Sequence, residues 1–169
     1  MKSFYFEEAT PLIEFFEQHK NSIIGHTLDE LITDNWPVKA QRVLSDTPVI
    51  LKLDNCTLVV TYYFPSSMTI RVCTEEELEN DMSIVGLLHC GPHHFDRREI
   101  RKQKIQGRKI ADITVERFSD AFECDPHGDV RPAGGDYFST IRLFLHKGKT
   151  LCLRGADSII DGYSEMWCE

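Results

Sequence analysis

Alternating apolar and polar residues in the last third of the chain predict a β-hairpin. A polar turn from His146 to Lys149 divides this stretch into two extended arms. A further short strand is predicted beyond them, in residues 157–162. The apolar positions of the two arms are Phe138, Ile141, Leu143, Leu145, Leu151 and Leu153. We therefore expect the two arms to lie at the centre of a sheet.

A second stretch, residues 49–60, carries the same kind of pattern earlier in the chain. Its sequence VILKLDNCTLVV places β-forming residues on both sides of Asp54 and Asn55, two residue types that are common in tight turns. Apolar residues then resume at alternating positions from Met68 to Val72. The pattern predicts a second hairpin followed by another strand of the sheet.

Helical spacing replaces this alternation near the N-terminus. Thr10 followed by Pro11 is typical of a helix start, because a threonine hydroxyl can accept a free N–H and proline suits the first turn. The helix is predicted to end near Asn21. Residues 23–32 fit either a short helix or a strand. The apolar stripe that should pack on the sheet is Leu12, Ile13, Phe15 and Phe16.

These elements predict an α+β fold, with an N-terminal helix packed on a largely antiparallel sheet in a single domain of residues 1–169. Two β-rich halves, residues 23–73 and 105–163, are joined by a charged connector, residues 74–104. Both halves begin with a glycine followed at three-residue intervals by apolar residues. An internal repeat would explain this likeness, although unrelated hairpins also share an alternating pattern. The two glycine patterns are Gly25-x-x-Leu28-x-x-Leu31 and Gly107-x-x-Ile110-x-x-Ile113.

Charge and composition narrow the class of partner. The 169 residues include 27 acidic and 19 basic side chains, a formal net charge of -8 that favours a basic partner and opposes general attraction to nucleic acid. No apolar run approaches the ~20 residues that span a bilayer. Glu7 and Glu8 interrupt any signal-peptide pattern. We expect a cytoplasmic protein without a membrane segment, whose six cysteines are free thiols.

Two near-identical tetrapeptides are candidate metal ligands. Cys90-Gly-Pro-His93 and Cys124-Asp-Pro-His127 each place a thiol and an imidazole on either side of a proline-containing bend. Zinc binds thiolate and imidazole in tetrahedral sites, so the two turns together could complete a Cys2His2 shell. The alternative is that both are ordinary polar loops.

A basic segment, residues 97–109, is a candidate contact surface for phosphates or an acidic protein. Its alternative is a solvated helix that balances the acidic residues before it. Trp167 could anchor a partner, or could fold back onto the sheet. The basic residues that we single out as binding candidates are Arg97, Arg98, Arg101 and Lys102.

No complete catalytic motif is present in the sequence, which favours a non-enzymatic role. The leading hypothesis is an acidic cytoplasmic protein-binding module, for example an inhibitor or immunity protein that covers a basic partner, with no cofactor. The first alternative is a zinc-binding protein, with either a structural site or a small metal-dependent hydrolase site. The second alternative is a nucleic-acid binder that uses residues 97–109.

Overall fold

Antiparallel sheet dominates the molecule. The computed structural model describes residues 2–32, 36–37, 42–45, 48–63, 67–80, 105–118, 122–124, 130–132, 136–155 and 164–168. The elements up to residue 80 are β1 Lys2–Phe6, α1 Ala9–Ile23, β2 Thr27–Ile32, β3 Trp36–Pro37, β4 Arg42–Ser45, β5 Val49–Leu53, β6 Thr57–Tyr63, β7 Ser67–Cys73 and α2 Glu75–Asn80. The later elements are β8 Arg108–Phe118, β9 Phe122–Cys124, β10 Val130–Pro132, β11 Tyr137–Leu145, β12 Lys149–Gly155 and β13 Ser164–Cys168.

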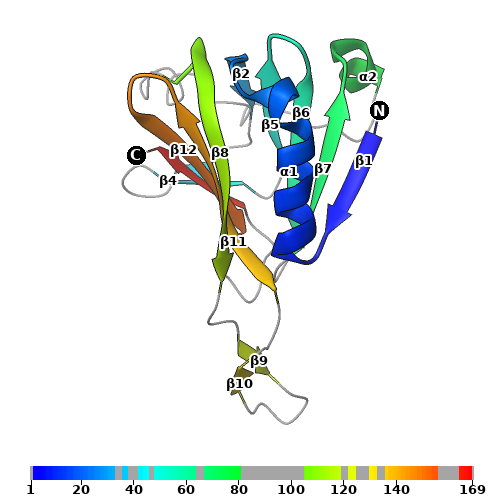
Figure 1. Ribbon diagram of the computed structural model, residues 1–169, viewed down its shortest axis with the longest axis vertical. Helices are drawn as coiled ribbons and strands as arrows, with labels where there is room; N and C mark the ends of the chain where they lie inside the picture. The colour runs from blue at the N-terminus through cyan, green and yellow to red at the C-terminus, as the bar shows by residue number, and fades with distance from the viewer. Residues whose placement is uncertain are drawn as a thin grey trace.

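One sheet of eleven described strands runs through both halves of the chain, in the order β1-β7-β6-β5-β2-β8-β11-β12-β13-β4-β3. Each described pair of neighbours is antiparallel, which confirms the largely antiparallel sheet (Figure 1). The N-terminal helix follows β1 instead of opening the chain. The fold is therefore mostly sheet, and the predicted α+β class overstates the share of helix.

Both predicted hairpins are present, as β5–β6 and β11–β12. The undecided segment 23–32 forms strand β2 from Thr27 onward, because it pairs with β5 on one side and β8 on the other. Strand β1 was not predicted, and it pairs along its whole length with β7 at one edge of the sheet. The strand predicted in residues 157–162 lies outside the described residues.

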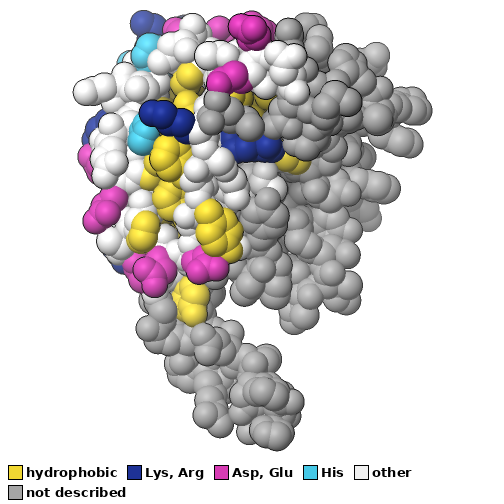
Figure 2. Space-filling model, turned by 90° about the vertical axis from the view of Figure 1, so that its right-hand side faces the viewer, with side chains coloured by type: hydrophobic (Ala, Val, Ile, Leu, Met, Phe, Trp, Pro, Cys, Tyr) yellow, Lys and Arg dark blue, Asp and Glu magenta, His cyan; other side chains and the backbone are white. Residues whose placement is uncertain are grey.

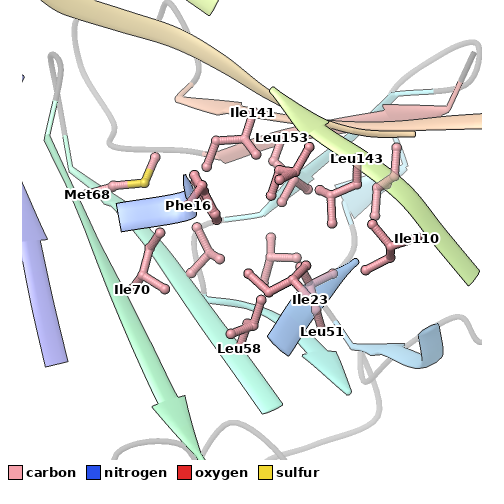
Figure 3. Packing of buried hydrophobic residues seen from close by; sticks show 14 of the residues in the cluster. Phe16, Ile23, Leu51, Leu58, Met68, Ile70, Ile110, Ile141, Leu143 and Leu153 are labelled. Carbon is pink, nitrogen blue, oxygen red and sulfur yellow. The ribbon is translucent and has the colours of Figure 1, made fainter. Parts of the chain in front are cut away.

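Helix α1 and the inner face of the sheet enclose one hydrophobic core. Three of the four predicted helical core residues, Leu12, Phe15 and Phe16, are buried, and Ile13 packs at the edge of the core. Side chains from both halves of the sheet point toward one another beneath the helix (Figure 3). The labelled residues in that view are Phe16, Ile23, Leu51, Leu58, Met68, Ile70, Ile110, Ile141, Leu143 and Leu153.

A hydrogen bond across the core ties the two halves together. The buried Tyr62 hydroxyl on β6 donates to the backbone carbonyl of Leu153 on β12, at 2.9 Å. Burial raises the pKa of Tyr62 well above its usual value, so the phenol stays protonated and remains a donor. Strands β6 and β12 are distant in the sheet order, so this contact shows that the sheet curls around its core.

The start of α1 differs from the predicted cap. The helix begins at Ala9 and runs to Ile23, so Thr10 lies inside it instead of capping it. Asp136, from the distant start of β11, takes the capping role: its carboxylate accepts the Thr10 N–H at 2.7 Å and its backbone carbonyl accepts the Ala9 N–H at 2.6 Å. Arg117 donates to both the Asp136 carboxylate and the Thr10 hydroxyl. The local threonine signal was overridden by a long-range contact.

None of the helices in the described part of the chain has the length and apolarity needed to span a bilayer.

Candidate functional site

A pocket of about 510 Å³ opens beside the β5–β6 turn. That turn lies at the upper end of the sheet in Figure 1. Its walls come from β2, β5, the start of β6 and the first residues of α2. Most of the lining is polar. The lining residues are Asp29, Glu30, Leu31, Lys52, Leu53, Asp54, Asn55, Cys56, Thr57, Thr74, Glu75 and Gln106.

Negative charge prevails in this pocket. Four carboxylates line it, and the only cation among the lining residues, Lys52, is already paired. The Lys52 ammonium lies 3.0 Å from a Glu75 carboxylate oxygen and 3.8 Å from one of Glu30. Asp29 and Asp54 therefore add charge that Lys52 does not offset. At the upper end of the described surface in Figure 2, acidic side chains lie among Lys or Arg and His side chains.

Asp54 is held in place by two neighbours. The His26 imidazole donates from Nδ1 to Asp54 Oδ1 at 2.6 Å, and the Thr27 N–H donates to Oδ2 at 3.2 Å. The hydrogen bond from His26, helped by Thr27, keeps the pKa of Asp54 below its usual value. Asp54 is therefore a fixed and ionised carboxylate at neutral pH.

The rest of the turn is fastened to the end of α1. Asn55 donates from its side-chain amide to the Ser22 carbonyl at 2.9 Å, and the Leu53 N–H closes the turn onto the Cys56 carbonyl at 2.8 Å. The carboxylates on this side of the pocket thus rest on backbone that is anchored to both a helix and a strand. A site held in this way loses little freedom when a ligand binds.

Helix α2 supplies the opposite wall, and a capping box sets its start. The Thr74 hydroxyl accepts the Glu77 N–H at 3.2 Å, while the Glu77 carboxylate accepts the Thr74 N–H at 2.9 Å. Leu78 covers an apolar cluster on the outer face of the sheet with Ile50, Val59 and Cys73. This packing places Glu75, in the first turn, at the pocket.

Cys56 does not give the pocket a nucleophile. Burial raises the pKa of the Cys56 thiol, and nearby Cys73 and Asp54 raise it further. A nucleophilic cysteine needs the opposite shift, toward the thiolate at neutral pH. In the described part of the chain, no group of three or more His, Cys, Asp or Glu side chains is placed to hold a metal ion. The four carboxylates of the lining suit contact with a cationic group.

Of the four residues of the predicted zinc site, only Cys124 lies among the described residues. Cys90, His93 and His127 lie outside the described residues. Cys124 ends β9, paired with Val130 of β10 in a small separate sheet, and its side chain is not described. The zinc hypothesis stays a prediction.

The predicted basic and aromatic contact residues are placed only in part. Arg97, Arg98, Arg101 and Lys102 lie outside the described residues. The last part of that segment forms the start of β8. Trp167 lies on β13, opposite Cys152 of β12 and Arg42 of β4, and its side chain is not described. Nucleic-acid binding through residues 97–109 also stays a prediction.

Sequence reasoning missed the pocket because its walls come from separate segments. One local signal was available: Thr74 with Glu77 three residues later is the capping-box pattern, which predicts α2. The pairing of Lys52 with Glu30 and Glu75 had no such signal, since it depends on the strand register and on the position of the helix.

Comparison with known proteins gives no relative from which to transfer a function. No protein-family model matches the chain, and neither the curated proteins nor the solved structures contain a match.

Proposed function

We propose that this protein is an acidic, non-enzymatic binding module of the inhibitor or immunity type, and that its pocket receives a basic side chain of a partner protein. The observation that carries the proposal is the pocket itself. Asp29, Glu30, Asp54 and Glu75 line it around a single, already paired lysine. An ammonium or guanidinium group entering this space would meet carboxylates on both walls.

The fixed position of Asp54 supports recognition by geometry as well as by charge. Its carboxylate is held by His26 and Thr27 before any partner arrives, so binding need not order that side chain. Opposite charges across an interface also speed association and exclude wrongly charged partners. The net charge of -8 adds a long-range attraction for a basic surface.

We place this activity in the cytoplasm and in one domain of residues 1–169. Free thiols at Cys56, Cys73 and Cys152, in the described part of the chain, are compatible with a reducing compartment. Side chains from both halves in the same core support a single domain. We also propose an α+β fold class, because α1 is an integral part of the core.

Titration with a basic peptide tests the proposed function without knowledge of the natural partner. Isothermal titration of the full chain with hexa-arginine should show binding that weakens as salt rises. Asp29→Asn combined with Glu30→Gln should weaken it about three- to tenfold, as expected for the loss of two partly exposed charges. Hexaglutamate should not bind at the pocket.

The matched control is Asp112→Asn. Asp112 is an exposed carboxylate on β8, so its loss lowers the total charge without altering the pocket. The comparison is made per charge removed. If Asp112→Asn weakens hexa-arginine binding as much as Asp29→Asn combined with Glu30→Gln does, general attraction explains the binding and the pocket has no special role.

A further inference from the structure

The β2–β5 pair and the β8–β11 pair share one register near their hairpin turns. In the first half, Leu28 of β2 pairs with Leu53 of β5, the register then shifts, and Leu31 pairs with Leu51. Strands β8 and β11 of the second half pair in the same way. Ile110 pairs with Leu145, the register then shifts, and Ile113 pairs with Leu143. The residues passed over at the shifts are Asp29 and Ala111.

The hydrogen bonds outside the ladders repeat in the same way. The Asp54 N–H donates to the Thr27 carbonyl at 3.1 Å, and the His146 N–H donates to the Lys109 carbonyl at 2.9 Å. Each is the first residue of its hairpin turn. The strand order β7-β6-β5-β2 is likewise mirrored by β13-β12-β11-β8. Two four-stranded units with the same strand order, and with the same register in the β2–β5 and β8–β11 pairs, therefore meet where β2 pairs with β8.

Two glycines mark a local two-fold relation at this meeting point. The Gly25 N–H donates to the Ile110 carbonyl, and the Gly107 N–H donates to the Leu28 carbonyl, both at 2.8 Å. Both glycines have positive φ, 84° and 77°. A two-fold rotation that exchanges the two units turns the Gly25–Ile110 hydrogen bond into the Gly107–Leu28 hydrogen bond. The axis of this rotation therefore passes between β2 and β8.

The side chains around the two hairpin turns differ in charge, although not at every equivalent position, because Asp112 on β8 takes the place of Glu30 on β2. In the first unit, His26 and Asp54 flank the hairpin turn, and Arg108 and His146 occupy the same places in the second. We call the first surface the acidic corner and the second the basic corner. The acidic corner consists of Asp29, Glu30, Asp54 and Glu75. The basic corner consists of Arg108, Lys109, Lys147 and Lys149.

We propose that the two units are copies of one ancestral unit, and that two chains pair through this end of the sheet, the acidic corner of each against the basic corner of the other. The pairing rests on the proposed function, because it makes a second copy of the chain the basic partner. Both corners lie at the end of the sheet where β2 and β8 begin, on opposite sides of that strand pair (Figure 1). One two-fold rotation between chains then forms both contacts at once.

Exposure and charge complementarity favour a second copy as the occupant. Lys109 and Lys147 are exposed at the basic corner, and the Glu75 side chain is 71% exposed at the acidic corner. The net charge of -8 repels two whole chains, so the two corner contacts must outweigh that repulsion. We therefore expect a weak dimer that forms at high protein concentration, dissociates readily and depends on salt.

Mixing two charge-reversed full-length chains tests this pairing. The first variant, Lys109→Glu with Lys147→Glu and Lys149→Glu, makes both corners acidic. The second, Asp29→Lys with Glu30→Lys and Glu75→Lys, makes the first corner basic. Sedimentation equilibrium should show self-association of the natural chain, at least tenfold weaker self-association of each variant alone, and recovery of association in the equimolar mixture. Circular dichroism should first confirm that both variants are folded.

A natural chain that stays monomeric at the highest soluble concentration, or a mixture that associates no better than its components, overturns the pairing. Hexa-arginine separates this failure from failure of the proposed function. The first variant keeps its acidic corner and should still bind that peptide. If it does while the mixture stays monomeric, the proposed function stands without self-pairing. If neither the natural chain nor this variant binds the peptide, the proposed function fails.

Discussion

The β5–β6 and β11–β12 turns occupy equivalent places in the two units but are stabilised by different means. At the first turn, the Asp54 side chain bonds His26 and the Thr27 N–H. At the second, Lys147 and Gly148 adopt positive φ, 71° and 74°. Arg108 donates to the His146 carbonyl at 3.0 Å, and more weakly to that of Lys147. One turn thus relies on a carboxylate, and the other on backbone conformation and a cation.

This difference shows which parts of the fold are fixed and which are free to vary. The buried pairs set the register, because a slip by one residue would turn apolar side chains outward. The turn side chains face solvent and can exchange charge without disturbing that register. Opposite electrostatic surfaces can therefore arise on one backbone plan.

The test of the two units with the largest expected effect removes equivalent core side chains. Leu28 and Ile110 are both fully buried, at 0% exposure. Leu28→Ala and Ile110→Ala should each lower the free energy of unfolding by about 2–5 kcal/mol, through lost burial and the cavity left behind. Urea denaturation measures both. Asp112→Ala, at an exposed site, should change stability by less than ~0.5 kcal/mol. A large cost at one core position only would show that the units are packed differently.

The two central glycines give a finer test. A Cβ at Gly25 or Gly107 would meet no atom within 4 Å, so only the positive φ opposes a side chain. Gly25→Ala and Gly107→Ala should each cost about 1–2 kcal/mol in unfolding free energy. Asparagine, which tolerates this conformation better, should cost less at both sites. Unequal losses, measured by the same denaturation, would count against the local two-fold relation.

Removing the hydrogen bond between the halves should have a smaller effect. Tyr62→Phe keeps the ring in the core but leaves the Leu153 carbonyl without this donor. We expect a loss of about 1 kcal/mol in unfolding free energy. Thermal and chemical unfolding should remain single transitions if the halves stay one cooperative unit. Two separate transitions would show that this bond couples otherwise independent halves.

The smallest expected effect concerns the cap of α1, and it depends on pH. Asp136→Ala should lower the melting temperature by about 2 °C at pH 7, as for loss of a modest capping interaction. Hydrogen bonds from Thr10, with the charge of Arg117, hold the pKa of Asp136 below its usual 3.8. A lowered pKa in the folded state stabilises the protein above the unfolded value, and this contribution is lost as the pH falls through the folded value.

Scanning calorimetry from pH 7 to pH 3 should therefore show the melting temperatures of the natural chain and of Asp136→Ala converging at low pH. Asp112→Ala serves as the control. A difference between Asp136→Ala and the natural chain that is constant at every pH would mean that the carboxylate charge does not stabilise the helix.

The strands could be predicted where their pattern is local. Residues 49–53 and 137–145 carry enough alternating β-forming residues to identify both hairpins. The continuous apolar run at Val49–Leu51 reflects burial on both faces, since Leu78 of α2 covers Ile50 from outside. The equal registers support the internal repeat suggested by Gly25 and Gly107, but its ancestry stays a proposal.

The candidate site could not be predicted because its residues are far apart in the sequence. Lys52, Glu30 and Glu75 lie on a strand, its neighbour and a helix, and only the folded register brings them together. The same holds for α1: its sequence predicts that the Thr10 hydroxyl caps the helix, whereas in the fold the Asp136 carboxylate accepts the Thr10 N–H. Local propensity is a weak guide wherever a distant side chain offers a stronger partner.

The capping of α1 by Asp136 also bears on the order in which the protein folds. During synthesis the helix is made early, but its capping carboxylate follows 126 residues after Thr10. Strand β2 must likewise wait for β8 before its second edge is paired. Such long-range contacts slow folding and leave apolar surface exposed meanwhile. We therefore expect the cap of α1 and the second edge of β2 to form late in folding, after the second half has been synthesised.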